Sequence, residues 1–528
     1  MLKFKTQKPE DCILSIDAGT QSVRAVIFDL NGNIREIVKT PIEPYYSIQP
    51  GWAEQDPEYF WKMLCVTCRK LFSIRRVNRD SIRGATITSQ RDTMINLDKN
   101  GKPLRPAIVW YDQRRARNNS KWPPFYLKII LKALNLMEAV NYSITECEAN
   151  WIMQNQPEIW EKTFKFLFLS GYLTYKLTDE FIDSTANQVG FVPFDFKTQT
   201  WAKSSHNYWK RILIDKDKLT ELVKPAGILG YITKRASNET GIPEGLPLIA
   251  AAPDKACEVL GSGCLTPEIA CLSFGTTATV ETTNSKYIEV VPFIPPFPSA
   301  VPGAYNTEVM IYRGFWLVSW FKREFGQDEV RIARKKKITP EQLFDRMIKD
   351  IPPGSMGLTL QPFWSPGIKV PGPEAKGAII GFGDVHTRAH LYRSILEGLV
   401  YGLKEGTERT QKRNKVKIER VRVSGGGSQS DEAMQITADI FNLPTEKPHT
   451  FETSALGAAI DAAVGLGFYP NFESAVKGMT RLSDTFHPEP RNRDIYAELY
   501  QNVYLKMYDR LKPLYESIRS ITGYPPER

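Results

Sequence analysis

A carboxylate follows one of the apolar runs of the sequence. Asp254 comes after the run Leu248 to Ala252 and a single proline. α/β folds place working residues at the ends of buried strands, where a carboxylate can accept the proton of a substrate hydroxyl. Such a residue suits phosphoryl transfer to an alcohol, which needs an oriented nucleophile and neutralised phosphate charge. The segment "PDKACEVLG" can also begin a helix, so Asp254 considered alone is equally well explained as a helix cap.

A second carboxylate begins a corner of small residues near the N-terminus. The apolar run Ile13 to Ile16 stops at Asp17, the corner Ala18-Gly19-Thr20 follows, and a second apolar run extends from Val23 to Leu30. This pattern predicts a β-hairpin. Small hydroxyl and amide residues are typical of turns that hold phosphate, whereas the carboxylate of Asp17 would repel phosphate. The residues alone do not explain why this corner begins with an acid.

Two further polar stretches follow predicted strands. In residues 424–432, "SGGGSQSDE", three glycines allow the backbone to approach a flat ligand or a phosphate, although the stretch lacks the Lys-Ser/Thr pair of a P-loop. In residues 88–93, "TSQRDT", Arg91 places a donor fork beside the acceptor Asp92, and such a pair can grip vicinal hydroxyls of a polyol. Considered separately, the first stretch is weak evidence for nucleotide contact, and the second is as well explained by a surface ion pair.

The elements that would position these residues are arranged twice along the chain. Residues 269–283, "IACLSFGTTATVETT", repeat the order of apolar run, Gly-Thr corner and apolar run. Between the two corners, predicted strands and helices alternate, which is typical of α/β layers. We therefore predict a duplicated architecture in which each half begins with a hairpin that faces a common cleft. The boundary is placed near Gly261-Ser262-Gly263, a segment predicted to be flexible.

Two later stretches predict helices with packing roles. "ETSALGAAIDAAVGLGFYP" predicts a helix of small residues, which permits close approach of backbones. Near the C-terminus, a stripe of large side chains at helical spacing is expected to pack against the C-terminal domain rather than to bind a ligand. The stripe consists of Tyr496, Tyr500, Tyr504, Met507 and Leu511.

Length and charge limit the possible classes of protein. The chain has 528 residues, which is too long for one ordinary core, and two domains of roughly 200 to 250 residues are expected. Its formal net charge of +10 would favour anionic substrates such as nucleotides. The basic residues are scattered along the chain, which argues against nucleic-acid binding. The densest run, Arg334 to Lys337, is explained as the solvated face of a helix.

The cysteine pattern and the N-terminal residues indicate a cytoplasmic protein. Seven cysteines, an odd number in so long a chain, predict free thiols in a reducing compartment. Cys65 and Cys68 lie in a predicted helix capped by Asp56, where buried packing explains them better than a metal or redox site. The first residues are polar and lack the apolar core of a signal peptide, and no apolar window is long enough for a membrane span.

Taken together, these stretches resemble the FGGY family of carbohydrate kinases, within the sugar kinase–Hsp70–actin superfamily. "DAGTQSVRAVIFD" is similar to the family's first phosphate motif, "LSFGTTA" to its second and "VSGGGSQSDEAMQITADIF" to its adenosine motif. "PEAKGAIIGFGDVHTRAHLYRSILEGLVYGL" is similar to the family's C-terminal signature, with Phe382 where a smaller aliphatic residue is usual. The resemblance extends from about residue 12 to residue 480.

The resemblance implies an α/β fold of two ribonuclease-H-like (actin-like ATPase) domains around a deep cleft. The N-terminal kinase domain would span residues 11–261 and carry the substrate and first phosphate motifs. The C-terminal kinase domain would span residues 262–480, and residues 481–528 would form a helical extension packed on it. The implied activity is ATP-dependent phosphorylation of a hydroxyl group of a sugar or polyol, with ATP and Mg²⁺ as cofactors.

The resemblance also implies roles for individual residues. Asp254 matches the general base, and Asp17 would face Mg²⁺, usually through water, which explains the acid in the first corner. Arg91 and Asp92 sit where glycerol kinases carry Arg-Glu against the substrate hydroxyls, and Lys255 matches another substrate position. The residues implied for the nucleotide are Thr20, Gln21, Ser22 and Arg24 in the first phosphate loop, Thr276 at the second phosphate contact, Gly426 and Ser430 beside adenosine, and Ser319.

The sequence departs from glycerol kinases around the substrate. Xylulose and gluconate kinases usually carry Met-His in place of Arg91-Asp92, so this pair leans toward the glycerol kinases, although Asp92 is one methylene shorter than glutamate. Counting back from Trp151 places Ser143, with Tyr142 adjacent, where glycerol kinases carry a tyrosine that contacts the substrate. "DSTANQVGFVPFD" also replaces the more usual Ala-Ser-Thr run. A smaller side chain at position 143 implies a wider pocket and a substrate other than glycerol, such as a longer polyol or a sugar.

We therefore predict a carbohydrate kinase whose partner is a small-molecule sugar or polyol, without nucleic acid or membrane; a homodimer is left open. The alternative is a catalytically inactive nucleotide- or sugar-binding regulatory protein on the same fold. Asp17, Asp254 and the Arg91-Asp92 pair argue against it. An Hsp70-like chaperone would need a peptide-binding β domain, and the residues after the family motifs are too few and too helical for one.

Overall fold

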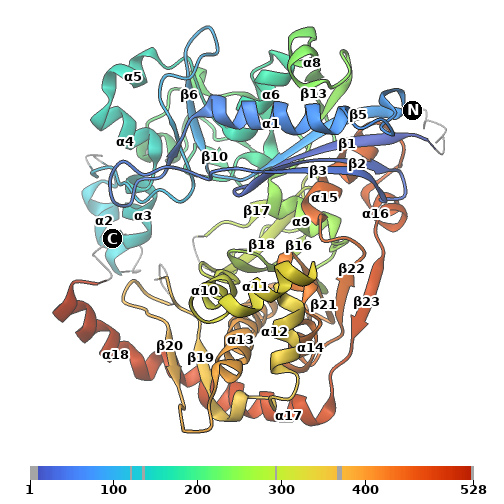
Figure 1. Cartoon of the computed structure of the whole chain (residues 1–528). Helices are drawn as coiled ribbons and strands as arrows, with labels where there is room; N and C mark the ends of the chain where they lie inside the picture. Colours follow the sequence, from blue (N-terminus) through green and yellow to red (C-terminus); the bar gives the residue numbers. More distant parts are fainter. Residues whose placement is uncertain (1–9, 119–121, 134–136, 292–293, 366–370, 525–528) are drawn as a thin grey trace. The chain divides into compact units, whose positions relative to one another are not determined.

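The computed structural model divides the chain into two α/β units (Figure 1). The structure describes residues 10–118, 122–133, 137–291, 294–365 and 371–524. Unit 1 comprises Met1–Gly263, Ser285–Asn306 and Ser454–Thr480, and unit 2 comprises Cys264–Asn284, Thr307–Thr453 and Arg481–Arg528. Two stretches that the sequence analysis placed in the C-terminal domain thus pack in unit 1, namely residues 285–306 and 454–480.

The main sheet of unit 1 has the strand order β13-β14-β5-β1-β2-β3. The strands are β1 (Cys12–Ala18), β2 (Ser22–Asp29), β3 (Ile34–Pro41), β5 (Ile82–Ser89), β13 (Ile228–Tyr231) and β14 (Pro247–Ala250). β1 pairs antiparallel with β2, so the hairpin predicted at the first corner is confirmed. β5 pairs parallel with both β1 and β14, and β13 pairs antiparallel with β14.

The main sheet of unit 2 repeats this pattern. Its strand order includes β18-β16-β15-β21-β22-β23. The strands are β15 (Ile269–Phe274), β16 (Ala278–Asn284), β18 (Tyr305–Ile311), β21 (Arg420–Ser424), β22 (Thr445–Pro448) and β23 (Leu482–Phe486). Along β16-β15-β21-β22-β23 the pairing is antiparallel, parallel, parallel and antiparallel, the same sequence of pairings as along β2-β1-β5-β14-β13. The predicted duplication is therefore confirmed.

Shorter strands form the remaining sheets. A four-stranded sheet of unit 1 has the order β4-β7-β6-β8, and the others are pairs. The strands are β4 (Glu54–Gln55), β6 (Met94–Leu97), β7 (Ala107–Ile108), β8 (Lys165–Phe168), β9 (Ile182–Ser184), β10 (Phe194–Asp195), β11 (Thr200–Trp201), β12 (Glu221–Val223), β19 (Thr359–Gln361) and β20 (Ala378–Ile380). β17 (Phe297–Pro298) belongs to none of these sheets and pairs antiparallel with Tyr305 and Asn306 of β18. β6 follows β5 after a four-residue corner, so the corner that holds Arg91 and Asp92 joins two sheets.

Helices surround the sheets of each unit. In unit 1 they are α1 (Pro57–Phe72), α2 (Phe125–Ala133), α3 (Met137–Thr145), α4 (Glu148–Asn155), α5 (Pro157–Lys162), α6 (Leu169–Thr178), α7 (Tyr208–Arg211), α8 (Lys234–Thr240), α9 (Asp254–Gly261) and α16 (Phe472–Met479). α15 (Thr453–Gly465) belongs to unit 1 except for its first residue. In unit 2 they are α10 (Trp316–Phe325), α11 (Gln327–Lys336), α12 (Pro340–Ile348), α13 (Arg388–Asn414), α14 (Asp431–Phe441), α17 (Pro490–Leu499) and α18 (Leu505–Thr522).

Short turns of other helix types complete the described backbone. The 3₁₀ turns are η1 (Arg79–Ser81), η2 (Thr185–Asn187), η3 (Lys216–Lys218), η4 (Ser355–Gly357) and η5 (Gly426–Gln429). η6 (Tyr500–Tyr504) is a π-helical turn between α17 and α18. It contains part of the predicted aromatic stripe, and Tyr496, Tyr500 and Tyr504 are buried in the core of unit 2. The expectation that the stripe serves packing is confirmed for these tyrosines.

The helix of small residues packs as its composition predicts. In α15, the Cα of Gly457 lies so close to α9 that a methyl group at this position would overlap the carbonyl oxygen of Cys257. The hydroxyl of Ser15 on β1 donates to the carbonyl oxygen of Ala455, at 2.8 Å. α15 therefore closes the core of unit 1 against both β1 and the helix that begins with Asp254.

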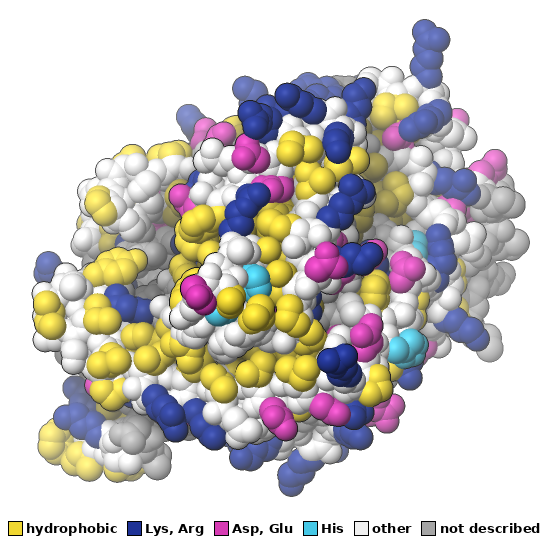
Figure 2. Space-filling view, turned by 60° about the horizontal axis from the view of Figure 1, so that its bottom comes forward, with side chains coloured by type: hydrophobic (Ala, Val, Ile, Leu, Met, Phe, Trp, Pro, Cys, Tyr) yellow, Lys and Arg dark blue, Asp and Glu magenta, His cyan; other side chains and the backbone are white. Residues whose placement is uncertain are grey.

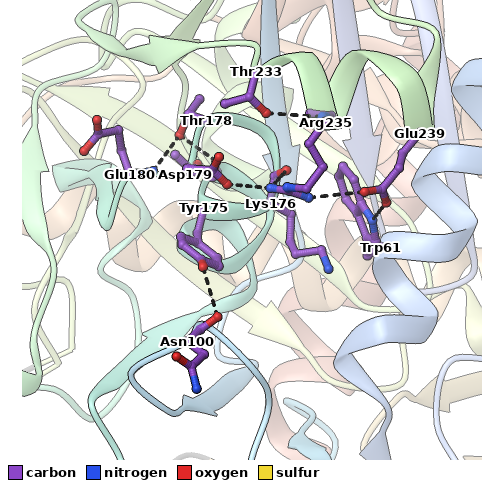
Figure 3. A network of polar contacts seen from close by, with 12 residues as sticks. Trp61, Asn100, Tyr175, Lys176, Thr178, Asp179, Glu180, Thr233, Arg235 and Glu239 are labelled. Carbon is purple, nitrogen blue, oxygen red and sulfur yellow. Dashed lines mark hydrogen bonds and ion pairs between the residues drawn. The ribbon is translucent and has the colours of Figure 1, made fainter.

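A polar network joins the helices α1, α6 and α8 of unit 1 (Figure 3). The indole nitrogen of Trp61 on α1 donates to Glu239 on α8 at 2.7 Å. Arg235 on α8 forms an ion pair of 2.6 Å with Asp179, and it donates to the carbonyl oxygen of Lys176 at the end of α6. Because Arg235 and Asp179 are both substantially exposed, we attribute orientation of the helices, rather than much stability, to their pair.

The surface and the thiols agree with the expectations from composition. All seven cysteines are free and buried, including Cys65 and Cys68 on α1. The side chains of Arg334 to Lys337 are exposed at the end of α11, as predicted for a solvated run. On the face drawn in Figure 2, basic side chains are interspersed with acidic and hydrophobic ones. Within the described ranges, no helix combines the length and the apolar content that crossing a membrane requires.

The segment Gly261-Ser262-Gly263 differs from its prediction. It was expected to be flexible, but all three residues are buried, and the backbone amide of Ser262 caps the C-terminus of α9. The glycines permit a tight exit from a packed helix, with Gly263 in the left-handed region. Glycine-rich composition therefore marked a buried turn here, not an exposed linker.

Candidate active site

Three neighbouring parallel strands of unit 1 end at the residues that the sequence singled out. β5 is the middle strand, between β1 and β14. Asp17 is the penultimate residue of β1, Arg91 and Asp92 follow β5, and Asp254 follows β14. Because the carboxyl ends of parallel strands meet at one edge of a sheet, these side chains converge on that edge. The register confirms the alignment, since Asp17 pairs with Thr88 near the end of β5.

Asp254 is both a strand-end residue and the first residue of a helix. It begins α9, and one of its carboxylate oxygens accepts a hydrogen bond of 2.8 Å from the backbone amide of Lys255. Its side chain is half-buried. Burial raises the pKa of Asp254 to about 6, with Lys255 and Arg91 lowering it and Asp17 raising it. The N-cap of α9 is Pro253, so Asp254 is the first helical residue and not the cap, and the start of the helix holds its carboxylate at the strand edge.

Lys255 is held by its own helix. Its ammonium group forms an ion pair of 2.9 Å with Glu258, one turn further along α9. Glu258 is buried, whereas Lys255 is half-buried. The positive charge beside Asp254 lowers the pKa of that carboxyl and so offsets part of the effect of burial.

Asp17 is paired across the first hairpin. The guanidinium of Arg24 on β2 donates to Oδ2 of Asp17 at 2.6 Å, and the two residues are directly opposite in the register. Asp17 is 1% exposed. The sequence analysis grouped Arg24 with the phosphate loop, and the structure shows that this side chain fixes the predicted metal-side carboxylate.

The corner between β1 and β2 presents its small residues in different ways. The hydroxyl of Thr20 accepts a hydrogen bond of 3.1 Å from the indole of Trp110. Gln21 is exposed, and its carbonyl oxygen accepts from the amide of Ile42 at 3.0 Å. Ser22 is buried as the first residue of β2. Of these three, Gln21 and half-buried Thr20 are accessible to a ligand.

Arg91 and Asp92 occupy a constrained corner. The guanidinium carbon of Arg91 lies 5.0 Å from the centre of the Phe297 ring, a cation–π contact. Asp92 has a φ of 55°, in the left-handed region that an aspartate adopts at some cost. Its Oδ1 is buried and has no hydrogen-bond partner among the described residues. Burial and the negative charge of Glu146 raise the pKa of Asp92, and Arg91 lowers it.

The unusual stretch "DSTANQVG" supports Asp92. Its last residue, Gly190, leaves room for the carboxylate, since a methyl group there would overlap Oδ1 of Asp92. Its first residue, Asp183, is buried and organises the stretch by accepting from the side chains of Asn187 and Gln188, at 2.8 and 3.1 Å. The sequence marked this stretch as a departure from the family, but its contact with Asp92 depends on tertiary packing that no local pattern shows.

Ser143 and Tyr142 make different contacts in the structure. The hydroxyl of Ser143 donates to the carbonyl oxygen of Val140 at 2.8 Å and accepts from Arg211 at 3.4 Å. The ring of Tyr142 meets the ring of Phe191 edge-on, with centres 5.9 Å apart. Phe191 is the residue next to Gly190, which contacts Asp92. Tyr142, and not Ser143, is therefore the residue linked by described contacts to the corner of Asp92.

A further carboxylate near this corner was missed by sequence reasoning. Glu148 begins α4, and burial together with the charge of Asp92 raises its pKa well above the usual range. Arg115 forms an ion pair of 2.6 Å with Glu146 nearby. The only sequence signal was the repeated acid in "TECEAN", which is too common to single out.

Unit 2 carries the other residues predicted for the nucleotide, Thr276, Ser319, Gly426 and Ser430. Thr276 lies in the corner between β15 and β16, and its carbonyl oxygen accepts from the amide of Trp316 at 3.3 Å. Trp316 is the first residue of α10, and Ser319 is exposed in the first turn of that helix. The second corner therefore lies against the start of a helix.

The triple-glycine turn follows β21, the middle one of the parallel strands β15, β21 and β22. Gly425 follows β21 with a φ of 82°, and a methyl group at Gly426 would meet no atom of the described residues within 4 Å. Gly427 is packed instead, since a methyl group there would overlap the Phe315 ring. Ser430 caps α14, accepting from the amide of Ala433 and donating to Asp345 at 2.6 Å. The hydroxyl of Ser430 is thus committed to the fold, and the open backbone is at Gly426.

Comparisons with known proteins give consistent matches over most of the chain. Residues 12–261 match the N-terminal domain, and residues 270–466 the C-terminal domain, of the FGGY family of carbohydrate kinases. An uncharacterized sugar kinase of Escherichia coli K12, YgcE, is 31% identical over 494 residues, covering 93% of this chain and 92% of the relative. A xylulose kinase of Staphylococcus epidermidis is 26% identical, covering 97% of this chain and all of the relative.

A third relative and a solved structure extend the likeness. Glycerol kinase 2 of Sulfolobus acidocaldarius is 27% identical, with 98% of each chain covered. The crystal structure of a ligand-bound xylulose kinase from Lactobacillus acidophilus superposes with a TM-score of 0.77 at 21% identity, covering 98% of this chain and 99% of that one. The predicted two-domain, actin-like α/β architecture is confirmed by this fold match. The chain belongs to the FGGY family of carbohydrate kinases.

Proposed function

We propose that this protein transfers the terminal phosphoryl group of ATP to a hydroxyl group of a sugar or polyol, with Asp254 as general base. The observation that carries the proposal is the strand edge of unit 1. There Asp254, whose pKa is raised to about 6, follows β14, and Arg91 and Asp92 follow the neighbouring strand β5. A carboxylate with this pKa is ionised at neutral pH and basic enough to accept a proton. Family membership supports the same reaction.

The side chains of unit 1 divide the work of the proposed reaction. Arg91, stacked on Phe297, donates hydrogen bonds to substrate hydroxyl oxygens, while Oδ1 of Asp92 accepts from a substrate hydroxyl. Asp254 takes the proton of the attacking hydroxyl as its oxygen bonds to phosphorus and the bond to ADP breaks. Lys255 keeps part of the Asp254 population ionised by lowering its pKa.

The residues present fit a magnesium–nucleotide complex. Asp17 and Asp254 offer carboxylate oxygens, which Mg²⁺ prefers, and Asp17 raises the pKa of Asp254 because the two negative charges repel. In unit 2 the open backbone at Gly426 leaves space for a flat or charged group. When bound, Mg²⁺ neutralises phosphate charge and ATP supplies the phosphoryl group. We propose Asp17 as the metal-side residue, with Thr20, Gln21, Ser22, Arg24, Thr276, Ser319, Gly426 and Ser430 around the nucleotide.

The cellular setting is part of the proposal. We expect the protein to act in the cytoplasm on a diffusible sugar or polyol, because all seven cysteines are free. Four- to seven-carbon polyols or ketoses are expected to be better substrates than glycerol. The xylulose and glycerol kinases among the relatives support a substrate of this general class.

A coupled assay of ADP release tests the proposed activity. The protein is incubated with Mg²⁺ and ATP and with glycerol, erythritol, xylitol, D-ribulose or D-xylulose in turn. We expect at least one acceptor of four or five carbons to raise ADP release at least tenfold above the rate with ATP alone. ATP binding in calorimetry without stimulation by any acceptor would favour the inactive regulatory protein instead.

Tyr142, rather than Ser143, is expected to limit the substrate. Because its ring packs beside the loop that contacts Asp92, Tyr142→Ala should lower kcat/KM for the best acceptor and reduce discrimination among chain lengths, each unburied methylene being worth about 0.8 kcal/mol. Ser143→Ala is the matched control, because the hydroxyl of Ser143 forms hydrogen bonds with Val140 and Arg211. Steady-state kinetics on three- and five-carbon acceptors measure both variants. A larger change in kcat/KM for Ser143→Ala than for Tyr142→Ala would support Ser143 as the substrate residue, as the sequence analysis predicts.

A further inference from the structure

Polar atoms without partners gather at the end of β5. Within the described residues, the side chains of Gln90, Asp92 and Thr93 each hold at least one buried nitrogen or oxygen that has no hydrogen-bond partner. Gln90 stands out, because neither its Nε2 nor its Oε1 has a partner in the described part of the chain although the residue is only 3% exposed. Buried polar groups in native proteins are nearly always bonded, so such a concentration needs an explanation.

Gln90 occupies the central position of the strand edge. It follows β5 directly, and its backbone amide donates to the carbonyl oxygen of Ala18 at the end of β1, at 3.1 Å. On the other side of β5 lies β14, which leads to Asp254. The strand that leads to Gln90 therefore lies between β1, which carries Asp17, and β14, which leads to Asp254.

The chemistry of the amide indicates the kind of partner that is missing. A side-chain amide has two N–H donors and one carbonyl acceptor, and here both kinds are unsatisfied. A phosphate oxygen would satisfy only the donors, and a metal ion only the acceptor. A hydroxyl group both accepts and donates, so it completes both functions at once. Since both atoms are unsatisfied, the argument does not depend on which is nitrogen and which is oxygen.

We propose that Gln90 binds a hydroxyl group of the sugar or polyol substrate and helps to determine which substrates are accepted. The proposal rests on the proposed kinase function and adds a residue to it. Gln90 lies next to Arg91 in the chain, so the two side chains bind adjacent hydroxyl groups of the substrate. Arg91 acts only as a hydrogen-bond donor, whereas Gln90 both donates and accepts. A substrate that lacks the hydroxyl facing Gln90 leaves the amide unsatisfied and is rejected.

Gln55 shows what a structural glutamine looks like in the same unit. It is 6% exposed, its Nε2 donates to the carbonyl oxygen of Glu43 at 2.8 Å, and its Oε1 accepts from the amide of Asp56 at 2.9 Å. Removing that amide would leave two partners unsatisfied. Removing the amide of Gln90 would leave no partner unsatisfied among the residues that the structure describes, so the two residues are a matched pair for an experiment.

The experiment compares Gln90→Met with Gln55→Met in the full-length protein. Methionine keeps the length of the side chain and removes its hydrogen bonds. We expect Gln90→Met to have an unchanged or higher melting temperature without ligand, and a kcat/KM for the best acceptor lowered roughly 10- to 100-fold, the equivalent of one to two lost hydrogen bonds. Gln55→Met should melt at a lower temperature and keep its kcat/KM.

Deoxy analogues of the best acceptor, each lacking one hydroxyl, supply the second measurement. One analogue should be discriminated against by the unmodified protein and not by Gln90→Met, because the hydroxyl and the amide are partners. A stabilising thermal shift by the acceptor alone should also shrink in Gln90→Met. A lower melting temperature with normal kinetics would show a structural role and overturn the proposal. Absence of turnover in the unmodified protein with every acceptor would instead refute the kinase function.

Discussion

Asp254→Asn is expected to lower turnover of the best acceptor by roughly 10²- to 10⁴-fold, the usual contribution of a general base. Asparagine keeps the shape of the side chain and can still accept the hydrogen bond from the amide of Lys255. The start of α9 should therefore persist, and ATP should bind with similar affinity. Single-turnover kinetics and calorimetric titration of ATP measure the two expectations separately.

The pH dependence of kcat/KM in the unmodified protein should follow the ionisation of Asp254. Burial raises the pKa of Asp254 to about 6, so the base is protonated and inactive below this pH. We expect kcat/KM to fall about tenfold for each pH unit below about 6 and to level off above it. The residual activity of Asp254→Asn should not show this decrease at acidic pH. If kcat/KM of the unmodified protein decreased only near the ordinary pKa of aspartate, another group would accept the proton.

Asp183→Asn is the matched control for these measurements. Asp183 is also buried, and its pKa is likewise raised to about 6. Its oxygens are bonded within the protein, by Ser170 at 2.7 Å among others, so we assign it a structural role. Its substitution should lower the melting temperature more than the turnover of folded protein. Near-normal turnover of Asp254→Asn on the true substrate would contradict the assignment of the base.

Gly457→Ala is expected to lower the free energy of unfolding by about 1 to 3 kcal/mol. The added methyl group would overlap the carbonyl oxygen of Cys257, and backbone atoms cannot rotate away as a side chain can. Helix propensity alone predicts the opposite sign, because alanine is better than glycine in a helix interior by about 1 kcal/mol. Because Cys257 lies on α9, a displaced α15 should also disturb Asp254 and lower turnover. Scanning calorimetry and steady-state kinetics measure both effects.

Gly383→Ala provides the comparison for Gly457→Ala. A methyl group at Gly383 would meet only His386, at 3.7 Å, an ordinary contact distance. This variant should melt within a degree or two of the unmodified protein. An increase in melting temperature for Gly457→Ala would show that the two helices separate easily, contrary to the close packing described.

Much of the fold could be predicted because its signals are local. The hairpin β1–β2 follows from two apolar runs around a small-residue corner, and β15–β16 follows from the same pattern. The strand after which Asp254 comes was visible as an apolar run, and the small residues of α15 indicated close packing. These features depend on neighbours in sequence, so composition and spacing suffice to find them.

The rest depends on contacts between distant segments. The pairing of Arg24 with Asp17 requires the register of the hairpin, and the support of Asp92 by Gly190 requires the loop to return to β5. The unsatisfied amide of Gln90 is a property of its surroundings, not of the string "TSQRDT". Counting residues back from Trp151 led to Ser143, whereas the contact between Tyr142 and Phe191 is visible only in the folded chain.

The discontinuous make-up of unit 1 has a consequence for biosynthesis. The core of unit 1 includes α15 and α16, which lie in the stretch Ser454–Thr480. A ribosome reaches that stretch only after roughly 200 residues beyond Gly263, which at about 5 to 20 residues per second takes on the order of 10 to 40 seconds. During this interval the nascent sheet lacks α15, the helix that packs against β1 and α9. The newborn chain therefore presents an uncovered apolar face to chaperones until its sequence is nearly complete, and translation speed between the two stretches becomes a determinant of yield.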